Sequence, residues 1–432
     1  MSRVRISSTA PTGQRLWIAG FSFASRTFAA LSVCASHRGV VYYILCGHAA
    51  LLPQRTFLGD EIVKTYRIFI INPGSTSTKL SMFENDRCLF TEDTFHDSSI
   101  LLGFPTINDQ LDYRMAVVHK FLRDREIDLR GVDAIVGRGG GCYSILGGVY
   151  NIDDKLIEDT REARGGLYHA SMLGVQMARV LHEEYGGLML MMDPPVVDEL
   201  CDLARVTGVR GVYRTAICHA LNLKETARRH ARSLGKHYED CNLIVCHIDG
   251  GISVTAHAHG RMIDGNDAGG GEGPFTPTRM GSMAVTDVIG ALGGCTQQEL
   301  KRLCSQAGGL TSHFGTSNSD TIHAMVERGD PRATRVWQAM IYQVCKAIGS
   351  MAAVLEGQVD GIVLTGGLLR FEDVLSDVQR RCGWIAPVTA YPGEFEQEAM
   401  AAGAMRVLTG EEEALTYPGR PVWNGFNDEK TL

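Results

Sequence analysis

The stretch Asn72-Pro-Gly-Ser-Thr-Ser-Thr-Lys79 follows a short β-branched run, residues 67–71, and precedes a second apolar run, residues 80–83. Short apolar runs bounded by turn residues are typical of buried strands, so this pattern predicts a β-hairpin with a turn rich in Ser and Thr. Gly74 permits a tight turn, the hydroxyl and backbone N–H groups are donors, and Lys79 adds a positive charge. These groups suit a phosphate, although an ordinary Ser/Thr-rich turn has the same composition.

Two later stretches repeat the pattern of an apolar run followed by glycines. Residues 242–247 form a predicted strand before Asp249-Gly250-Gly251, and residues 252–257 are its predicted hairpin partner. Residues 361–365 form another predicted strand, which ends in Gly366-Gly367. Both halves of the chain thus open with strand, glycine-rich turn and strand, a duplication of pattern. Apolar residues at helical spacing occur between the strands, at residues 217–230 and 336–355, so we predict an α/β fold with ligands beyond the strand ends.

The composition is that of a soluble globular protein. Of the 432 residues, 44% are hydrophobic and 21% are charged, and the formal net charge is −7. Because this balance is mildly acidic, nonspecific binding to nucleic acid or to an anionic membrane has no electrostatic support. The 12 cysteines form no CxxC pair and show no zinc-finger spacing, which is typical of reduced thiols. We therefore expect a cytoplasmic protein with neither a nucleic-acid nor a membrane partner.

Residues 1–65 differ from the rest of the chain. They begin with several arginines and continue into an apolar stretch, residues 16–35, which Arg26 interrupts. A targeting segment, a partly ordered accessory arm and a stretch read from an early start codon all fit this pattern. We favour the last, because the strand pattern of a complete domain begins at Tyr66. If this N-terminal extension is a targeting segment or a stretch read from an early start codon, we expect it to carry no chemistry.

Together the three turns resemble the signature of one family. Residues 72–79 match the phosphate motif N-x-G-S-[ST]-S-x-K of the acetate kinase family, a branch of the actin-like ATPase superfamily. Residues 247–253 resemble its second phosphate motif, and residues 365–367 its adenosine motif. Within that family the chain is more similar to the butyrate kinases, in the stretches at residues 136–141, 193–199, 219–222, 247–251 and 271–277. Acetate kinases usually read HxGNG where this chain has Asp249 and Gly250.

The resemblance, which extends from Tyr66 to about residue 410, implies two actin-like (ribonuclease H-like) domains with ATP or ADP in the cleft between them. We expect the first domain over residues 66–192 and the second over residues 193–393, with residues 394–432 as a helix that crosses back and a tail. Closure of the cleft would exclude water from the reaction. Nucleotide contacts are then expected from the three turns, at Asn72, Gly74, Ser75, Thr76, Ser77, Lys79, His247, Asp249, Gly250, Gly251, Gly366 and Gly367.

A carboxylate acceptor makes different demands from a hydroxyl acceptor. Its pKa is about 4, so it is ionised at neutral pH and needs no general base, whereas cations must hold two anions together. Arg138 lies in a glycine-rich strand-end turn, and by resemblance it meets the substrate carboxylate. Arg279 matches an arginine near the transferring phosphoryl group, His219 a histidine that stabilises the transition state, and His169 a further active-site position. Asp193 matches a residue near the metal or the attacking carboxylate. A structural ion pair, turn cap or packed histidine would also fit these residue types.

Magnesium is expected to bridge the phosphates, since Mg²⁺ binds through one or two carboxylates together with phosphate oxygens and water. The candidate ligands are Asn72 and the C-terminal carboxylates Glu396 and Glu398, beside Glu394. Gln397 occupies the position where one alignment requires the glutamate. The implied reaction converts ATP and butyrate, or a branched short-chain acid, into ADP and an acyl phosphate, in a homodimer or higher homo-oligomer.

Two alternatives differ from this hypothesis. The first is a kinase of the same family that acts on acetate or propionate, because one methylene contributes only about 1–3 kcal/mol to discrimination. The second is a nucleotide-gated actin-like protein without phosphoryl transfer. Such a protein does not need Arg138 and Arg279 together, and a sugar kinase would instead need an aspartate base. The pair of arginines therefore favours a carboxylate kinase.

Overall fold

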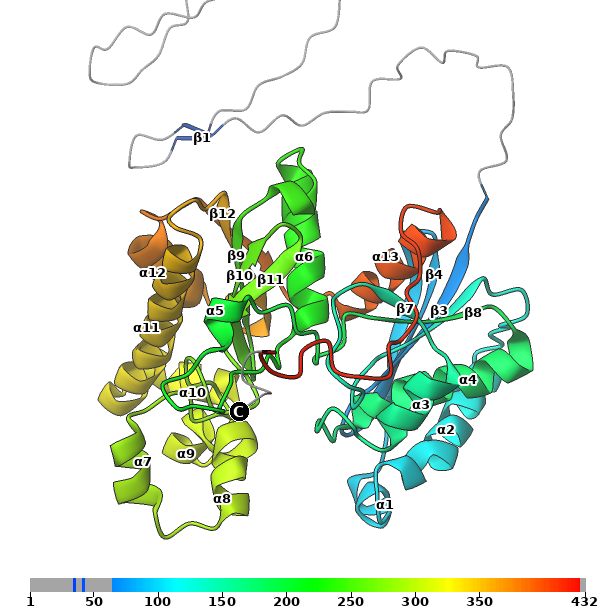
Figure 1. The fold of residues 1–432 in the computed structure, drawn as a ribbon, viewed down its shortest axis with the longest axis horizontal. Coiled ribbons are helices and arrows are strands. Elements are labelled where there is room, and N and C mark those ends of the chain that lie inside the picture. Colours follow the sequence, from blue (N-terminus) through cyan, green and yellow to red (C-terminus); the bar gives the residue numbers. More distant parts are fainter. Residues whose placement is uncertain (1–33, 36–40, 43–63, 428–432) are drawn as a thin grey trace, which may run out of the picture. The chain divides into compact units, whose positions relative to one another are not determined.

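The structure of the protein is a computed structural model that describes residues 34–35, 41–42 and 64–427. The chain divides into two units, residues 1–63 and residues 64–432. In the first unit, β1 (Cys34–Ala35) pairs antiparallel with β2 (Val41–Tyr42). The competing interpretations of residues 1–65 fall almost wholly outside the described residues. Both sheets that carry the sequence motifs lie in the second unit (Figure 1).

The first sheet has six strands, and its central strand β3 is followed by the Ser/Thr-rich turn. Its members are β3 (Arg67–Pro73), β4 (Ser77–Glu84), β5 (Arg87–Phe95), β6 (Ala134–Gly137), β7 (Val149–Asn151) and β8 (Leu188–Met192). The order is β5-β4-β3-β6-β8-β7, in which β3, β4 and β5 form an antiparallel meander and β6 and β8 add in parallel. The predicted hairpin is confirmed, with Asn72 opposite Lys79.

The second sheet repeats this topology with five strands. Its members are β9 (Leu243–Ile248), β10 (Ile252–Ala258), β11 (Arg261–Gly265), β12 (Gly361–Gly366) and β13 (Val388–Pro392). The order is β11-β10-β9-β12-β13, again an antiparallel meander followed by two parallel strands. The duplication predicted from the sequence pattern is therefore a duplication of topology.

Thirteen α-helices lie in the described part of the chain. The predicted helices correspond to α6 and α11; α11 begins earlier than predicted, because Asp330 caps it and Pro331 suits its first turn. Among the described residues, no helix is both long and apolar enough to cross a bilayer. The bounds are α1 (Ser98–Leu102), α2 (Leu111–Asp124), α3 (Asp154–Arg161), α4 (Leu173–Tyr185), α5 (Asp202–Arg205), α6 (Ala220–Ser233), α7 (Val285–Leu292), α8 (Gln297–Arg302), α9 (Gly309–Phe314), α10 (Ser319–Glu327), α11 (Pro331–Val354), α12 (Glu372–Cys382) and α13 (Glu396–Leu408).

Helices cover both faces of each sheet, and alternate residues of a central strand face different cores. Phe69 and Ile71 of β3 pack in a core with α2 and α4, whereas Ile68 and Ile70 pack in a core with α13. In the second sheet, α11 packs on one face and α6 on the other. Helix α13 also contacts α6, so the last helix joins elements from both halves of the chain (Figure 1).

Candidate active site

The predicted carboxylate-binding arginine lies at the centre of the site. Arg138 directly follows β6 and is only 7% exposed. Its Nη2 donates to Glu396 Oε1 at 2.8 Å, while Asn72 Nδ2 donates to Glu396 Oε2 at 2.8 Å. The other terminal nitrogen, Nη1, is buried and has no acceptor among the described residues. The first turn, the end of β6 and the start of α13 therefore converge on one guanidinium group that still has a free donor.

Glu396 is the C-terminal carboxylate that reaches this group. Burial would raise its pKa, but the charge of Arg138 and the hydrogen bond from Asn72 outweigh that effect and hold the pKa below its usual range. Glu398, the other predicted metal ligand, is exposed, and the carboxylate that Asn72 contacts is that of Glu396. Two residues along a helix turn the side chain by roughly half a revolution, which separates the two carboxylates. Glu398 therefore lies away from Asn72 and the expected metal site, and Glu396 is the remaining candidate ligand of the two.

Two predicted histidines stack against each other beside the second turn. The rings of His219 and His247 lie 4.0 Å apart between centroids at an angle of 24°. His219, at the start of α6, has Nδ1 2.8 Å from Ser253 Oγ. Burial first, and then the positive groups Arg279 and Arg138 together with His247, lower the pKa of His219 well below its usual value. Both imidazoles are therefore neutral at neutral pH, since burial also lowers the pKa of His247.

Asn222, one helical turn after His219, fixes the tautomer of His247. The backbone N–H of Phe395 donates to Asn222 Oδ1 at 3.1 Å, so the amide nitrogen must face the other way. That nitrogen lies 2.8 Å from His247 Nδ1 and donates to it. A neutral His247 therefore carries its proton on Nε2, which lies 3.9 Å from Glu394 Oε1. Asn222 was not predicted as a site residue, although it lies in the stretch at residues 219–222 that resembles the butyrate kinases.

The second and third turns are tied together by one carboxylate. Asp249 Oδ1 accepts from the N–H of Gly250 at 2.7 Å, and Oδ2 accepts from the N–H of Gly367 at 2.5 Å. Gly366 has a φ of 108°, and a Cβ there would lie 2.4 Å from the carbonyl oxygen of Ile248. The predicted Thr-Gly-Gly turn is thus required for close packing of β12 against β9, as well as being a candidate nucleotide contact.

Arg279 lies directly against the second turn. A Cβ on Gly251 would be 2.3 Å from Arg279 Nη1, so a larger residue at this position would displace the guanidinium. Its Nε and Nη1 are buried and have no acceptor among the described residues. Burial lowers the pKa of Arg279, but Arg remains charged at neutral pH. Like Arg138, it is a cation that has buried donors without an acceptor among the described residues.

A small acidic group lies next to these cations. Ligand atoms of His247, Asp249 and Glu394 are within 4.8 Å of one another. Partial burial, followed by repulsion from Glu396 and Asp249, raises the pKa of Glu394 to about 7. Because His247 Nε2 carries a proton, that nitrogen is unsuited to bind a metal, whereas carboxylate oxygens suit Mg²⁺. The donor set therefore fits a magnesium ion held by oxygens alone.

His169 and the Ser/Thr-rich turn face each other. His169 Nδ1 accepts from the N–H of Ser171 at 3.2 Å, which leaves Nε2 as the protonated nitrogen of a neutral ring. That Nε2 lies 3.5 Å from Ser75 Oγ. In the turn, Gly74 N–H donates to the carbonyl of Ser77 at 2.8 Å, and Ser75 and Thr76 are exposed. Lys79 is half-exposed, 3.9 Å from Asp93.

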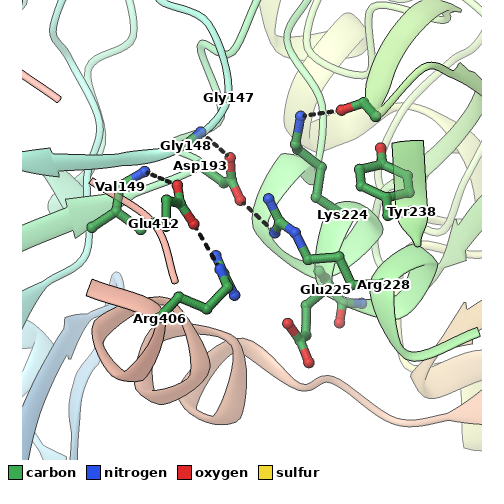
Figure 2. Close-up of polar contacts among 12 residues, drawn as sticks. Gly147, Gly148, Val149, Asp193, Lys224, Glu225, Arg228, Tyr238, Arg406 and Glu412 are labelled. Carbon is green, nitrogen blue, oxygen red and sulfur yellow. Dashed lines mark hydrogen bonds and ion pairs between the residues drawn. The ribbon is translucent and has the colours of Figure 1, made fainter. Parts of the chain in front are cut away.

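Asp193 belongs to a different group of charges, shown in Figure 2. Its Oδ1 accepts from the N–H of Gly148 at 2.8 Å, and its Oδ2 pairs with Arg228 at 3.2 Å. The charges that act on it are those of Arg228, Lys224 and Arg406, rather than Arg138 or Arg279. A cavity of about 560 Å³ adjoins this group, and none of the predicted site residues lines it. The structure thus gives Asp193 a structural partner and does not place it with the predicted catalytic residues.

Comparisons with known proteins identify the family of the chain. Residues 209–376 match the acetokinase family. The chain is 41% identical over 355 residues to a protein named probable butyrate kinase from Clostridium botulinum, covering 82% of this chain and 100% of that protein. It is 40% identical over 354 residues to butyrate kinase 2 from Clostridium acetobutylicum, covering 82% of this chain and 99% of the relative.

Solved structures show the fold. The crystal structure of acetate kinase from Porphyromonas gingivalis has a TM-score of 0.63 at 17% identity and covers 80% of this chain and 100% of its own. A propionate kinase from Francisella tularensis has a TM-score of 0.61 at 16% identity, covering 78% of this chain and 98% of its own. The predicted actin-like α/β fold is confirmed by these likenesses. With the sequence relatives, they establish that the chain belongs to the acetokinase family, a family of carboxylate kinases.

Proposed function

We propose that this carboxylate kinase acts on butyrate or a branched short-chain acid, with ATP as the phosphoryl donor and ADP and an acyl phosphate as products. The observation that supports the proposal is the pair of arginines, Arg138 and Arg279, whose guanidinium groups keep buried donors without an acceptor among the described residues. Two anions must meet in this reaction, and two such cations match that need. The names of the relatives favour butyrate over acetate.

Each arginine has its own task in the proposed reaction. Arg138 holds the carboxylate, and one carboxylate oxygen attacks the terminal phosphorus of ATP as the bond from that phosphorus to the bridging oxygen breaks, releasing ADP. Arg279 and the N–H donors of the first turn balance the charge on the phosphoryl oxygens. His219 and His247 are neutral donors to the same phosphoryl oxygens. The acid is already ionised at neutral pH, so no side chain has to remove a proton from it. His169 orients Ser75 from the other side.

Magnesium is part of the proposal. Asp249, Glu394 and Glu396 would hold it, and the Oδ1 of Asn72 is a further oxygen donor, since Asn72 Nδ2 is already used by Glu396. When bound, the ion neutralises phosphate charge. We further propose that the enzyme works in the cytoplasm as a homo-oligomer and that residues 1–65 are dispensable for activity.

A hydroxamate assay tests the substrate directly. Purified protein with Mg-ATP and each of acetate, propionate, butyrate and isobutyrate should yield acyl phosphate, trapped by hydroxylamine, at the highest kcat/KM with butyrate or isobutyrate. A preference for acetate or propionate would move the chain to the alternative within its family. No hydroxamate from any acid would refute the proposed function.

Arg138 can be tested separately. Arg138→Ala should raise the KM for the acid far more than the KM for ATP, because a charge-assisted contact from Nη1 to the carboxylate is lost. Arg130→Ala is a matched control, since Arg130 is exposed and, among the described residues, forms its ion pair with Asp128 alone. An acid KM that does not change in Arg138→Ala would remove its assigned role.

A further inference from the structure

Arg114 of α2 lies beneath the Ser/Thr-rich turn and is completely buried. Its Nη1 donates to the carbonyl oxygens of Gly74 at 3.0 Å and Ser77 at 3.2 Å, and to Thr78 Oγ1 at 3.3 Å. Its Nη2 donates to the carbonyl oxygen of Ser75 at 3.2 Å. One guanidinium thus contacts four residues of the stretch from its inner side.

A neutral side chain orients this guanidinium. Gln110 Oε1 accepts from Arg114 Nε at 3.1 Å and from Nη2 at 3.0 Å. All five donors of Arg114 are on Nε, Nη1 and Nη2, and each of these nitrogens has an acceptor. The group is therefore held in one orientation by Gln110, which directly precedes α2 and lies four residues before Arg114.

No carboxylate neutralises this cation. Every acceptor of Arg114 is a carbonyl, a hydroxyl or an amide oxygen, and no ion pair of Arg114 is found among the described residues. Burial lowers the pKa of Arg114 to about 10, so the group is still positive at neutral pH. A buried charge without a partner is costly to a folded protein. By contrast, the buried Lys224 is paired with Glu199 at 2.8 Å.

The carbonyls that face Arg114 determine where the N–H groups of the turn point. In a trans peptide the C=O and the following N–H point in opposite directions. Because the carbonyls of Gly74 and Ser75 are turned toward Arg114, the N–H groups of Ser75 and Thr76 are turned away from it. Neither N–H has an acceptor in the described part of the chain. The turn therefore presents two adjacent free donors on the side opposite the buried charge, which is an arrangement that binds oxyanions.

We propose that Arg114 is a positioning residue for the phosphoryl groups of the nucleotide: it fixes the turn with its N–H donors outward, and the bound phosphate is its missing counter-charge. This inference rests on the proposed function for the identity of the ligand, but it does not depend on which acid is phosphorylated. Arg114 does not touch the phosphate, because the turn lies between them.

Nucleotide binding tests the proposal without requiring turnover. Calorimetric titration of ADP, of ATP and of adenosine into wild type and Arg114→Met should show ADP and ATP weakened about 10- to 100-fold, the usual size for partners that orient a binding group. Adenosine, which has no phosphate, should bind equally to both. Arg123→Met is the matched control, since Arg123 lies on the same helix and is exposed. It should bind all three like wild type.

The outcomes separate this proposal from the proposed function. Unchanged ADP affinity in Arg114→Met, or equal losses for ADP and adenosine, would overturn the positioning role. If Arg114→Met does not fold, Arg114→Lys decides: it keeps the charge but loses the fork, and ADP affinity equal to wild type at a similar melting temperature would also overturn the role. A wild type that binds ADP but forms no acyl phosphate would refute the function and leave this result intact.

Discussion

Two groups of charged side chains in this molecule differ in whether their cations have carboxylate partners within the protein. In the paired network, defined by Asp193, Glu199, Lys224, Arg228, Arg406 and Glu412, each cation has a carboxylate within 3.2 Å. Figure 2 shows two of these pairs, Asp193 with Arg228 and Glu412 with Arg406. Among the described residues, the site arginines, defined as Arg114, Arg138 and Arg279, have only one carboxylate contact between them, from Arg138 to Glu396. Desolvation is compensated within the protein in the first group. In the second group this cost of desolvation is compensated only in part by the protein, and a bound anion would supply the rest. For this reason the second group is the candidate site.

The largest expected effect is on stability and comes from breaking the paired network. Lys224→Met leaves Glu199 buried without its cation, where the two side chains are now 2% and 3% exposed. We expect the free energy of unfolding to fall by about 3–5 kcal/mol, measured by urea denaturation. The activity of the molecules that remain folded should stay close to wild type. A loss below 1 kcal/mol (about the value of an exposed pair) would contradict the contrast between the two groups.

The second effect is on activity. Arg279→Met removes a cation whose Nε and Nη1 have no acceptor in the described residues. We expect kcat to fall about 10²- to 10³-fold, as for a lost transition-state donor. The free energy of unfolding should be unchanged or slightly higher, because a desolvated charge is gone. A large loss of stability without loss of kcat would mean that Arg279 has only a structural role.

The third effect is a pH dependence beside Arg114. His96 is 5% exposed, its Nε2 lies 2.8 Å from Thr78 Oγ1, and burial, with the nearby charge of Arg114, lowers its pKa to about 4. Between pH 6.5 and pH 4 the unfolded chain therefore binds more protons at this residue than the folded chain does. Its contribution to stability is complete above pH 6.5 and is lost as the pH falls toward 4.

His96→Gln removes that titration. The stability of wild type minus that of the variant should fall by roughly 1–3 kcal/mol from pH 7.5 to pH 4, measured by urea denaturation at both values. Subtracting the variant cancels the acid sensitivity of all other groups. A difference that stays constant with pH would show that His96 titrates normally in the folded protein.

The smallest effect is expected at the surface. Arg130→Met removes an ion pair with Asp128 whose side chains are 83% and 51% exposed. Water solvates both charges before and after the change, so the urea midpoint and the kinetics should not change measurably. A clear shift in the urea midpoint would show that an ion pair stabilises this protein even when it is exposed. Burial would then not explain the difference between the paired network and the site arginines.

Local sequence was sufficient for the strands and turns of the site. The apolar run before Asn72 is buried on both faces, and the glycines at positions 251 and 366 stand where a Cβ would collide with neighbours. Such features depend on a few adjacent residues, so pattern and turn chemistry predict them. Arg138 was identified for the same reason, because an arginine in a glycine-rich strand end is locally unusual.

Contacts between distant segments were decided only by the tertiary structure. Asn72 and Glu396 are 324 residues apart, and the docking of α13 selected Glu396 over Glu398 as the carboxylate that meets Asn72 and Arg138. The local sequence does not single out Arg114, since its burial depends on a turn 36 to 40 residues away. Asp193 lies in a stretch that resembles a site motif, but in the folded protein its carboxylate pairs with Arg228. Residue types and periodicity determine which elements form, whereas the packing of those elements determines which charges meet a partner and which are left for a ligand.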